Sequence, residues 1–261
     1  MNIRGELLDI KRHFLIWGIL FFFGVVALCG FSVSVSQGFD AEGFLKPSVS
    51  KSLASLFFIQ TKNDLLPEGV ELIATSPITA FLIHLKIGIL GSFVLFLPVL
   101  LYSFGRYLSP ALYREERRNF LLLTFLSTIL FLAGVVFAYR LLVLKMFSAL
   151  FSFNTSLDVT PYLAADDFIS WVLSALIISG VLFLLPIFMY TLAVIRVVGS
   201  SFWVIRWREA FVVFLVCASL ITPDVSGFSV VLLMLPVACL YMFGIFFAKI
   251  HEYRRKKSLS F

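Results

Sequence analysis

The stretch Phe120–Val143, FLLLTFLSTILFLAGVVFAYRLLV, decides the class of fold. An apolar run of about 18 to 25 residues, wound as a helix, is long enough to cross the roughly 30 Å hydrocarbon core of a membrane. The rest of the chain has the same character. Of its 261 residues, 61% are hydrophobic and 14% are charged, whereas soluble domains are about half apolar and a quarter charged. The sequence therefore predicts an all-α integral membrane protein.

Five more apolar stretches bring the predicted number of transmembrane helices to six. Together with the run above they lie at about 14–35, 78–104, 120–143, 168–195, 207–221 and 230–248. The fifth has only about 15 residues and barely reaches across at 1.5 Å per residue. We interpret residues 1–261 as a single membrane domain with an outer loop at 36–77, a second outer loop at about 145–167 and a basic tail at 249–261. The apolar patch 53–59 is too short to span, and we expect it to form a helix or strand over the outer mouth of the bundle.

Basic residues fix the predicted orientation, because the cytoplasmic flanks of membrane helices are enriched in Lys and Arg. With the N-terminus inside, 15 of the 21 basic residues fall on the inner side, at Arg4, Lys11, Arg12, Arg106, Arg114, Arg117, Arg118, Arg196, Arg206, Arg208, Lys249, Arg254, Arg255, Lys256 and Lys257. Both termini are therefore predicted to be cytoplasmic, in a multi-pass protein of the inner or plasma membrane. The net charge of +6 follows from the same bias and is not evidence for a nucleic-acid partner.

Three of the predicted helices contain a proline: Pro98 in the second, Pro186 in the fourth and Pro236 in the sixth. A proline inside a helix removes a backbone hydrogen bond and bends the helix. Kinks in alternate helices would curve the bundle into a concave wall. We therefore expect these prolines to shape a groove.

Ionisable side chains inside a membrane are costly, so each one is a candidate for a specific role. Lys86, in the second predicted helix, either extends to the outer interface or meets a structural or functional partner. Asp224 follows Pro223 at the outer end of the fifth helix, where capping a turn explains it better than catalysis. The sequence contains no G-x-S-x-G or H-E-x-x-H motif, no phosphate-binding loop and no metal-ligand spacing. We expect no enzymatic activity, no cofactor and no metal.

The connection Arg106–Arg118, RYLSPALYREERR, is the most distinctive charged segment. It places Glu115 and Glu116 among four arginines, directly after a Pro-Ala-Leu-Tyr turn and beside the membrane. One interpretation is a surface that binds a cationic group. The alternative is a solvated run of charges in which the neighbouring arginines neutralise the two glutamates.

Several motifs, taken in order, resemble the TatC family, the multi-spanning core subunit of the twin-arginine, Sec-independent protein translocase. They are SPITAFLIHLK at 76–86, LPVLLY at 97–102, SPALYREERR at 109–118, FLAGVVFAY at 131–139, GVLFLLP at 180–186, LITPD at 220–224 and LPVACLY at 235–241. The resemblance covers most of the chain from about residue 70 to 248. The family has six membrane helices with both ends in the cytoplasm, which agrees with the topology predicted above.

The resemblance implies a receptor for signal peptides that carry paired arginines, and a part in the export of folded proteins. The partners it implies are these precursor proteins, TatA- or TatB-like single-span proteins, the lipid bilayer and other copies of the chain. It also implies a recognition surface on the cytoplasmic side. The residues matching the family pattern there are Glu116 with neighbouring Glu115, and Asp9 and Lys11 in the N-terminal segment. The turn residues Tyr107, Pro110 and Leu112 are expected to be structural, like the helix prolines. Tyr139, which closes the third-helix motif, is a further polar residue near the membrane.

The chain departs from the family pattern at two positions where acidic residues are common. Leu184 stands two residues before Pro186, and Met242 follows Leu240 and Tyr241. The absence of these acids removes expected contacts for single-span partners. Two other functions therefore stay open at this point: a small-solute transporter or channel, and a divergent TatC-like scaffold without transport.

Overall fold

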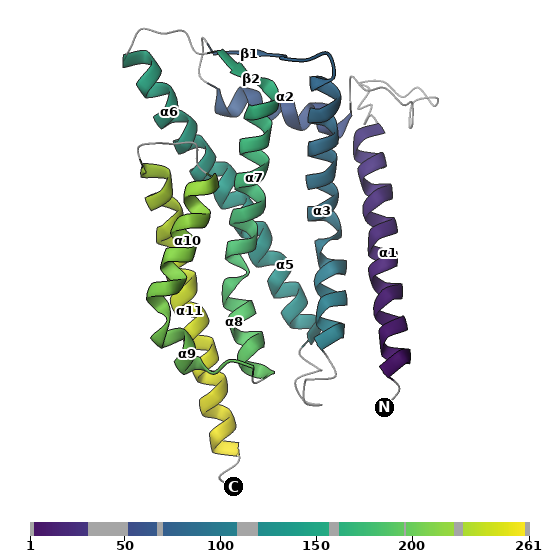
Figure 1. The fold of residues 1–261 in the computed structure, drawn as a ribbon, viewed down its shortest axis with the longest axis vertical. Coiled ribbons are helices and arrows are strands. Elements are labelled where there is room, and N and C mark those ends of the chain that lie inside the picture. Colours follow the sequence, from purple (N-terminus) through teal and green to yellow (C-terminus); the bar gives the residue numbers. More distant parts are fainter. Residues whose placement is uncertain are drawn as a thin grey trace, which may run out of the picture. The chain divides into compact units, whose positions relative to one another are not determined.

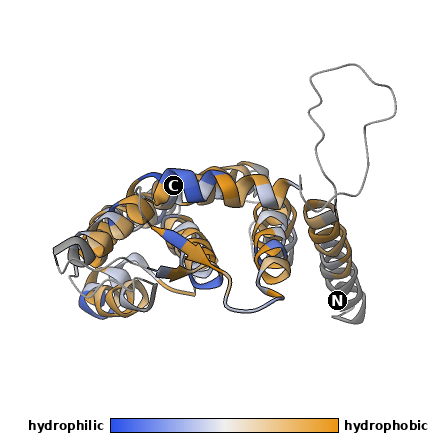
Figure 2. Ribbon diagram, turned by 90° about the horizontal axis from the view of Figure 1, so that it is seen from above, coloured by the Kyte–Doolittle hydropathy of each residue, from blue (hydrophilic) through white to orange (hydrophobic). Residues whose placement is uncertain are grey.

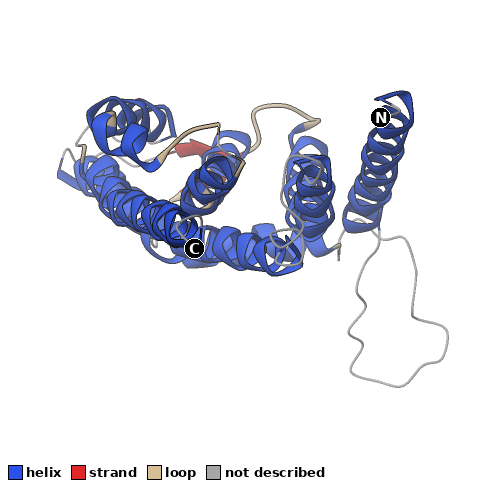
Figure 3. Cartoon of the chain, turned by 90° about the horizontal axis from the view of Figure 1, so that it is seen from below, coloured by secondary structure: helices blue, strands red, loops and turns tan. Residues whose placement is uncertain are grey.

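The computed structural model of the chain describes residues 3–30, 52–66, 70–108, 120–156, 162–195, 197–221 and 227–258. Helices dominate this part of the chain (Figure 3), and two strands of three residues each accompany them. The elements are α1 (Ile3–Gly30), α2 (Leu53–Leu65), β1 (Glu71–Ile73), α3 (Thr79–Leu108), α5 (Phe120–Phe137), the π-helix η3 (Ala138–Val143), α6 (Leu144–Ser156), β2 (Tyr162–Ala164), α7 (Ala165–Phe183), α8 (Leu185–Val194), α9 (Ser200–Ile205), α10 (Trp207–Ile221) and α11 (Phe228–Ser258). The predicted all-α class is confirmed.

Within the described residues, four helical stretches are long and apolar enough to cross a membrane. They are Thr79–Ser103, Leu122–Ser152, Ala165–Val194 and Val230–Tyr253, and α1 holds a shorter apolar stretch, Trp17–Cys29. Figure 2 shows hydrophobic residues along most of each of these helices. The chain is therefore a membrane protein, as its composition predicts.

The chain forms two compact units. The first combines Met1–Ser103 with Leu150–Leu173, and the second combines Phe104–Ala149 with Ser174–Phe261. Each unit takes segments that are far apart in the sequence. The interpretation of the whole chain as one membrane domain stays a prediction.

In the first unit, the predicted outer loop contains ordered elements. The apolar patch lies in α2, whose first turn is capped by Ser52: its side-chain oxygen accepts a hydrogen bond of 3.2 Å from the Ser55 amide. The Phe58 ring packs edge-on against Phe168 of α7, with 6.4 Å between the ring centroids. Figure 1 shows α2 lying crosswise near the beginnings of α3 and α7. The expectation of a helix or strand in this loop is met by α2 together with β1.

The strands β1 and β2 pair in parallel, with Glu71 opposite Tyr162 and Ile73 opposite Ala164. Parallel pairing demands that two distant segments run in the same direction side by side. Because α3 follows β1 and α7 follows β2, this pair brings the beginnings of two membrane helices together. The strand pair thereby sets the axial register between the side chains of α3 and those of α7.

The third predicted span does not end at Val143. The chain continues as a helix from α5 through η3 and α6 to Ser156, where the sequence predicted an outer loop from about residue 145. Met146 and Phe147 are fully buried, whereas Arg140 and Lys145 are exposed. The two cations led to the wrong boundary because a charge ends the apolar surface of a helix, while the backbone hydrogen bonds continue past it.

Two further boundaries differ from the prediction. The helix α11 extends to Ser258, so the predicted basic tail begins as a continuation of the last membrane helix. The fourth predicted span is divided at Leu184: α7 ends at Phe183, and α8 begins at Leu185 with Pro186 in its first turn. A proline is tolerated there because the first helical amides have no intrahelical acceptor. By contrast, Pro98 and Pro236 lie inside uninterrupted helices.

Candidate functional site

In the first unit, α1 and α3 pack as antiparallel neighbours. The Trp17 indole Nε1–H donates to the carbonyl oxygen of Phe96 at 3.2 Å, and the Cys29 thiol donates to that of His84, also at 3.2 Å. Residue numbers therefore increase along α1 in the direction in which they decrease along α3, so the two helices are antiparallel. Gly24 of α1 permits this approach, because a Cβ atom there would lie 2.5 Å from the Phe96 ring.

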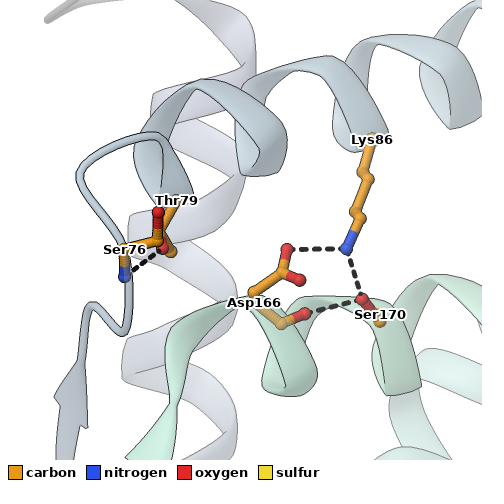
Figure 4. A network of polar contacts seen from close by, with 5 residues as sticks. All are labelled: Ser76, Thr79, Lys86, Asp166 and Ser170. Carbon is orange, nitrogen blue, oxygen red and sulfur yellow. Dashed lines mark hydrogen bonds and ion pairs between the residues drawn. The ribbon is translucent and has the colours of Figure 1, made fainter.

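Lys86 of α3 has a partner in α7. Its ammonium nitrogen lies 2.6 Å from Asp166 Oδ1 and donates to Ser170 Oγ at 2.9 Å (Figure 4). The Ser170 hydroxyl in turn donates to the backbone oxygen of Asp166 at 2.6 Å. Of the two interpretations of Lys86, the structure therefore supports a structural partner.

The first turns of α3 and α7 help to position and stabilise this ion pair. Asp166 lies in the first turn of α7, where the partial positive charge of the helix N-terminus favours a carboxylate. At the start of α3, Thr79 Oγ1 accepts a hydrogen bond of 3.1 Å from the Ser76 amide, as Figure 4 also shows. The side chains of Lys86 and Asp166 are 35% and 30% exposed. With both charges paired, this network is suited to joining α3 to α7 rather than to proton transfer.

In the second unit, two of the sequence motifs pack against each other. The Ser179 hydroxyl of α7 donates to the carbonyl oxygen of Gly134 in α5 at 3.1 Å. A Cβ atom on Gly134 would lie 2.8 Å from Ser179 O and 2.9 Å from Gly180 Cα. On the other side, Gly180 leaves room for the ring of Phe131, which is fully buried. The small residues of both motifs therefore serve helix packing.

A second acid, which sequence reasoning missed, also joins two elements. Glu252 of α11 accepts hydrogen bonds from the Ser200 amide at 2.6 Å and from the Ser200 hydroxyl at 2.7 Å, at the start of α9. Further along α9, the Tyr241 hydroxyl donates to the carbonyl oxygen of Trp203 at 2.7 Å. Glu252 lies among the basic residues at the end of the chain, and nothing in its neighbourhood indicated a partner 52 residues away. Together the two contacts hold α9 against α11.

Metal binding finds no support in the described residues, among which no three His, Cys, Asp or Glu side chains gather in an arrangement that would hold an ion. The polar groups described above are engaged with each other or with the backbone. These polar contacts hold the helices in their positions.

The sequence model of the family described as Sec-independent protein translocase protein (TatC) matches residues 6–236. The chain belongs to the TatC family. It is 36% identical to the TatC protein of Aquifex aeolicus over 190 residues, which cover 72% of this chain and 78% of that one. It is 32% identical to TatC of Cenarchaeum symbiosum over 212 residues, which cover 81% and 80% of the two chains.

Solved structures agree with this TatC assignment. A crystal structure of the twin-arginine translocase receptor TatC superposes with a TM-score of 0.71 at 29% identity, covering 94% of this chain and 98% of that one. A second structure of the receptor, in DDM, gives a TM-score of 0.73 at 30% identity, covering 93% and 99%. The fold predicted from the motifs is thus that of TatC.

Several of the predicted site residues lie outside the described part of the chain. Residues 109–119 hold Glu115, Glu116, Pro110 and Leu112, and residues 222–226 hold Asp224. Three others lie on helices whose backbone alone is described at those positions, Asp9 and Lys11 on α1 and Tyr107 on α3. Their roles stay predictions.

The two TatC departures do fall within the described residues. Leu184 is the residue that separates α7 from α8, and it is half-buried. Met242 of α11 is 60% exposed, next to Tyr241, which is fully buried. Tyr139 lies in the π-helix η3 and is half-buried.

Proposed function

We propose that this chain is the receptor subunit of a twin-arginine translocase, which binds signal peptides with paired arginines and takes part in the export of folded proteins. The proposal draws on the family membership and on the similarity to solved structures of the twin-arginine translocase receptor TatC. The observation that carries it within this chain is the antiparallel packing of α1 and α3.

This packing directs the N-terminal part of α1 along the part of α3 that follows Phe96. Asp9 precedes Trp17 by eight residues, about 12 Å along a helix, in the direction in which α3 runs from Phe96 to Ser103. Glu116 follows the end of α3 at Leu108 by only eight residues in sequence. We infer that Asp9 and Glu116 face the same side of the membrane, as the distribution of basic residues predicts.

The chemistry of the proposed ligand matches carboxylates. A guanidinium group presents a planar fork of N–H donors that two carboxylate oxygens accept in bidentate fashion. Two arginines need two such acceptors, and we assign them to Glu116 and Asp9, with Glu115 and Lys11 beside them. The apolar part of the signal peptide would lie in a groove shaped by the kinked helices.

The proposal includes six membrane helices with both termini in the cytoplasm, and TatA- or TatB-like proteins and further copies of the chain as partners. A small-solute transporter would need polar side chains along a path through the membrane. Lys86 and Asp166 neutralise each other, so this ion pair does not favour such a path. A scaffold that has lost transport is separated from a receptor by the experiment below.

The test is photo-crosslinking of this chain to a signal peptide that carries a photoreactive residue beside its twin arginines, compared with a peptide that has twin lysines instead. We expect crosslinks that need the arginines, and their loss in Glu116→Lys. Glu71→Lys is the matched control, because it reverses an exposed acid in β1 at a site remote in sequence. Equal crosslinking of both peptides, or undiminished binding by Glu116→Lys, would reject the assigned site.

A further inference from the structure

The segment from Val197 to Arg208, which contains α9 and leads into α10, exposes an unusual set of apolar side chains. Connections that face water are usually polar. Here Ile205 is 77% exposed, and four more large apolar residues of the segment are also exposed: Val197, Phe202, Val204 and Trp207. This surface needs an apolar environment on one side.

Two arginines lie on the same surface and are stacked on its aromatic rings. Arg206 Cζ lies 4.8 Å from the centroid of the Phe202 ring, and Arg208 Cζ lies 5.5 Å from that of Trp207. Arg206 also contacts Glu209 at 3.3 Å, in a pair whose side chains are 55% and 69% exposed. A guanidinium stacked on a ring still presents the other N–H donors at its edge to phosphate oxygens. Arginine, tryptophan and apolar side chains side by side are typical of a helix in the membrane interface.

The contacts of α9 with α11 fix its depth. Glu252 holds the start of α9, and Tyr241 holds its middle. Glu252 lies at the end of the apolar stretch Val230–Tyr253 and Tyr241 at its middle, and Phe246 and Phe247 between them are themselves exposed. The segment α9 therefore lies beside the second half of a membrane helix, and at Ser200 it reaches the end of that helix, where hydrocarbon gives way to headgroups.

The length of α10 points to the same depth. Its 15 residues rise about 22 Å, less than the roughly 30 Å of the hydrocarbon core. The apolar surface of α9 continues into exposed residues of α10, among them Val212, Val213, Leu215 and Val216. An apolar α9 at the interface compensates for the short helix that follows it.

We propose that α9, with Trp207 and Arg208, is an interfacial anchor that binds anionic phospholipids. The apolar side chains enter the upper acyl region, and Arg206 and Arg208 bind the lipid phosphates. This anchor goes beyond receptor function and rests only on the proposed membrane position of α10. Lipid is the occupant, rather than a partner protein, because the patch is continuous with the apolar surface of membrane helices and its charge complements an anionic headgroup.

The test uses the full chain in nanodiscs of phosphatidylcholine with or without phosphatidylglycerol, and native mass spectrometry counts the lipids that it retains. We expect a preference for phosphatidylglycerol that falls about tenfold or more in Arg206→Gln/Arg208→Gln, since each interfacial arginine contributes to anionic-lipid binding. Arg206→Lys/Arg208→Lys should recover part of it. Arg140→Gln/Lys145→Gln, which removes the same charge from exposed positions of the third helix, should retain the preference.

An equal loss in the two glutamine variants would overturn the proposal, because the preference would then follow net charge alone. An unchanged preference in Arg206→Gln/Arg208→Gln would overturn it as well. A second readout places a photo-crosslinking amino acid at position 205 in membranes of the producing cells. Adducts with lipid support the anchor, and adducts with protein alone would assign this surface to a partner instead.

Discussion

The ion pair between Lys86 and Asp166 should contribute measurably to the stability of the first unit. Exposed ion pairs contribute about 0–1 kcal/mol, and breaking a fully buried pair costs about 3–5 kcal/mol. With side chains 35% and 30% exposed and a separation of 2.6 Å, this pair lies between the two cases. We expect Lys86→Met to cost about 2 kcal/mol. Asp166→Asn should cost more, because it leaves an ammonium without its counter-ion beside an apolar helix.

A double-mutant cycle isolates the pairwise contribution. Unfolding of the single variants and of Lys86→Met/Asp166→Asn in mixed micelles by added SDS, followed by far-ultraviolet circular dichroism, should give a coupling of about 1–2 kcal/mol. The matched control is the cycle Arg206→Gln with Glu209→Gln, a pair at 3.3 Å with both side chains mostly exposed, for which we expect at most about 0.5 kcal/mol. Equal coupling in the two cycles would refute the view that partial burial makes the first pair a specific link between α3 and α7.

Two further outcomes follow from single contacts. Gly134→Ala should destabilise the second unit by about 1–3 kcal/mol in the same unfolding assay, because its Cβ atom would press on the backbone of α7 at Ser179 and Gly180. Gly18→Ala, where a Cβ meets nothing within 4 Å, should cause no loss, because alanine also favours the helix more than glycine does. A similar loss in both variants would show that the close contact at Gly134 does not decide the outcome. Glu252→Gln should weaken the attachment of α9 to α11 by about 1–2 kcal/mol. Hydrogen exchange would detect this as faster exchange of the Ser200 amide. Unchanged exchange there would mean that Tyr241 alone holds α9.

The membrane helices could be predicted because the length of an apolar run is a property of the sequence itself. Their ends could not, because an α-helix needs no apolar surface to continue in water. The third helix passes Arg140 and Lys145 and runs to Ser156, since Met146 and Phe147 find a buried environment on its other side. The extension of α11 to Ser258 has the same origin. Charges thus mark where a helix leaves hydrocarbon, and tertiary contacts decide where it ends.

The partners of polar residues were harder to predict, because they depend on register between distant segments. Lys86 is recognisable in the sequence as a costly residue, but Asp166 lies 80 positions away and reaches it only because β1 and β2 align the starts of α3 and α7. Glu252 likewise reaches Ser200, 52 positions away in the sequence, only because the fold brings their helices together. In both cases the acid lies at the beginning of a helix, at its own for Asp166 and at a neighbour's for Glu252, where the helix dipole adds to the hydrogen bonds. Asp166 and Glu252 therefore join helices, whereas Glu116 and Asp9 are proposed to meet a cationic ligand. A carboxylate that recognises arginine has to be identified by its dependence on the arginines of the peptide, because a loss of binding on mutation would also follow from a displaced helix.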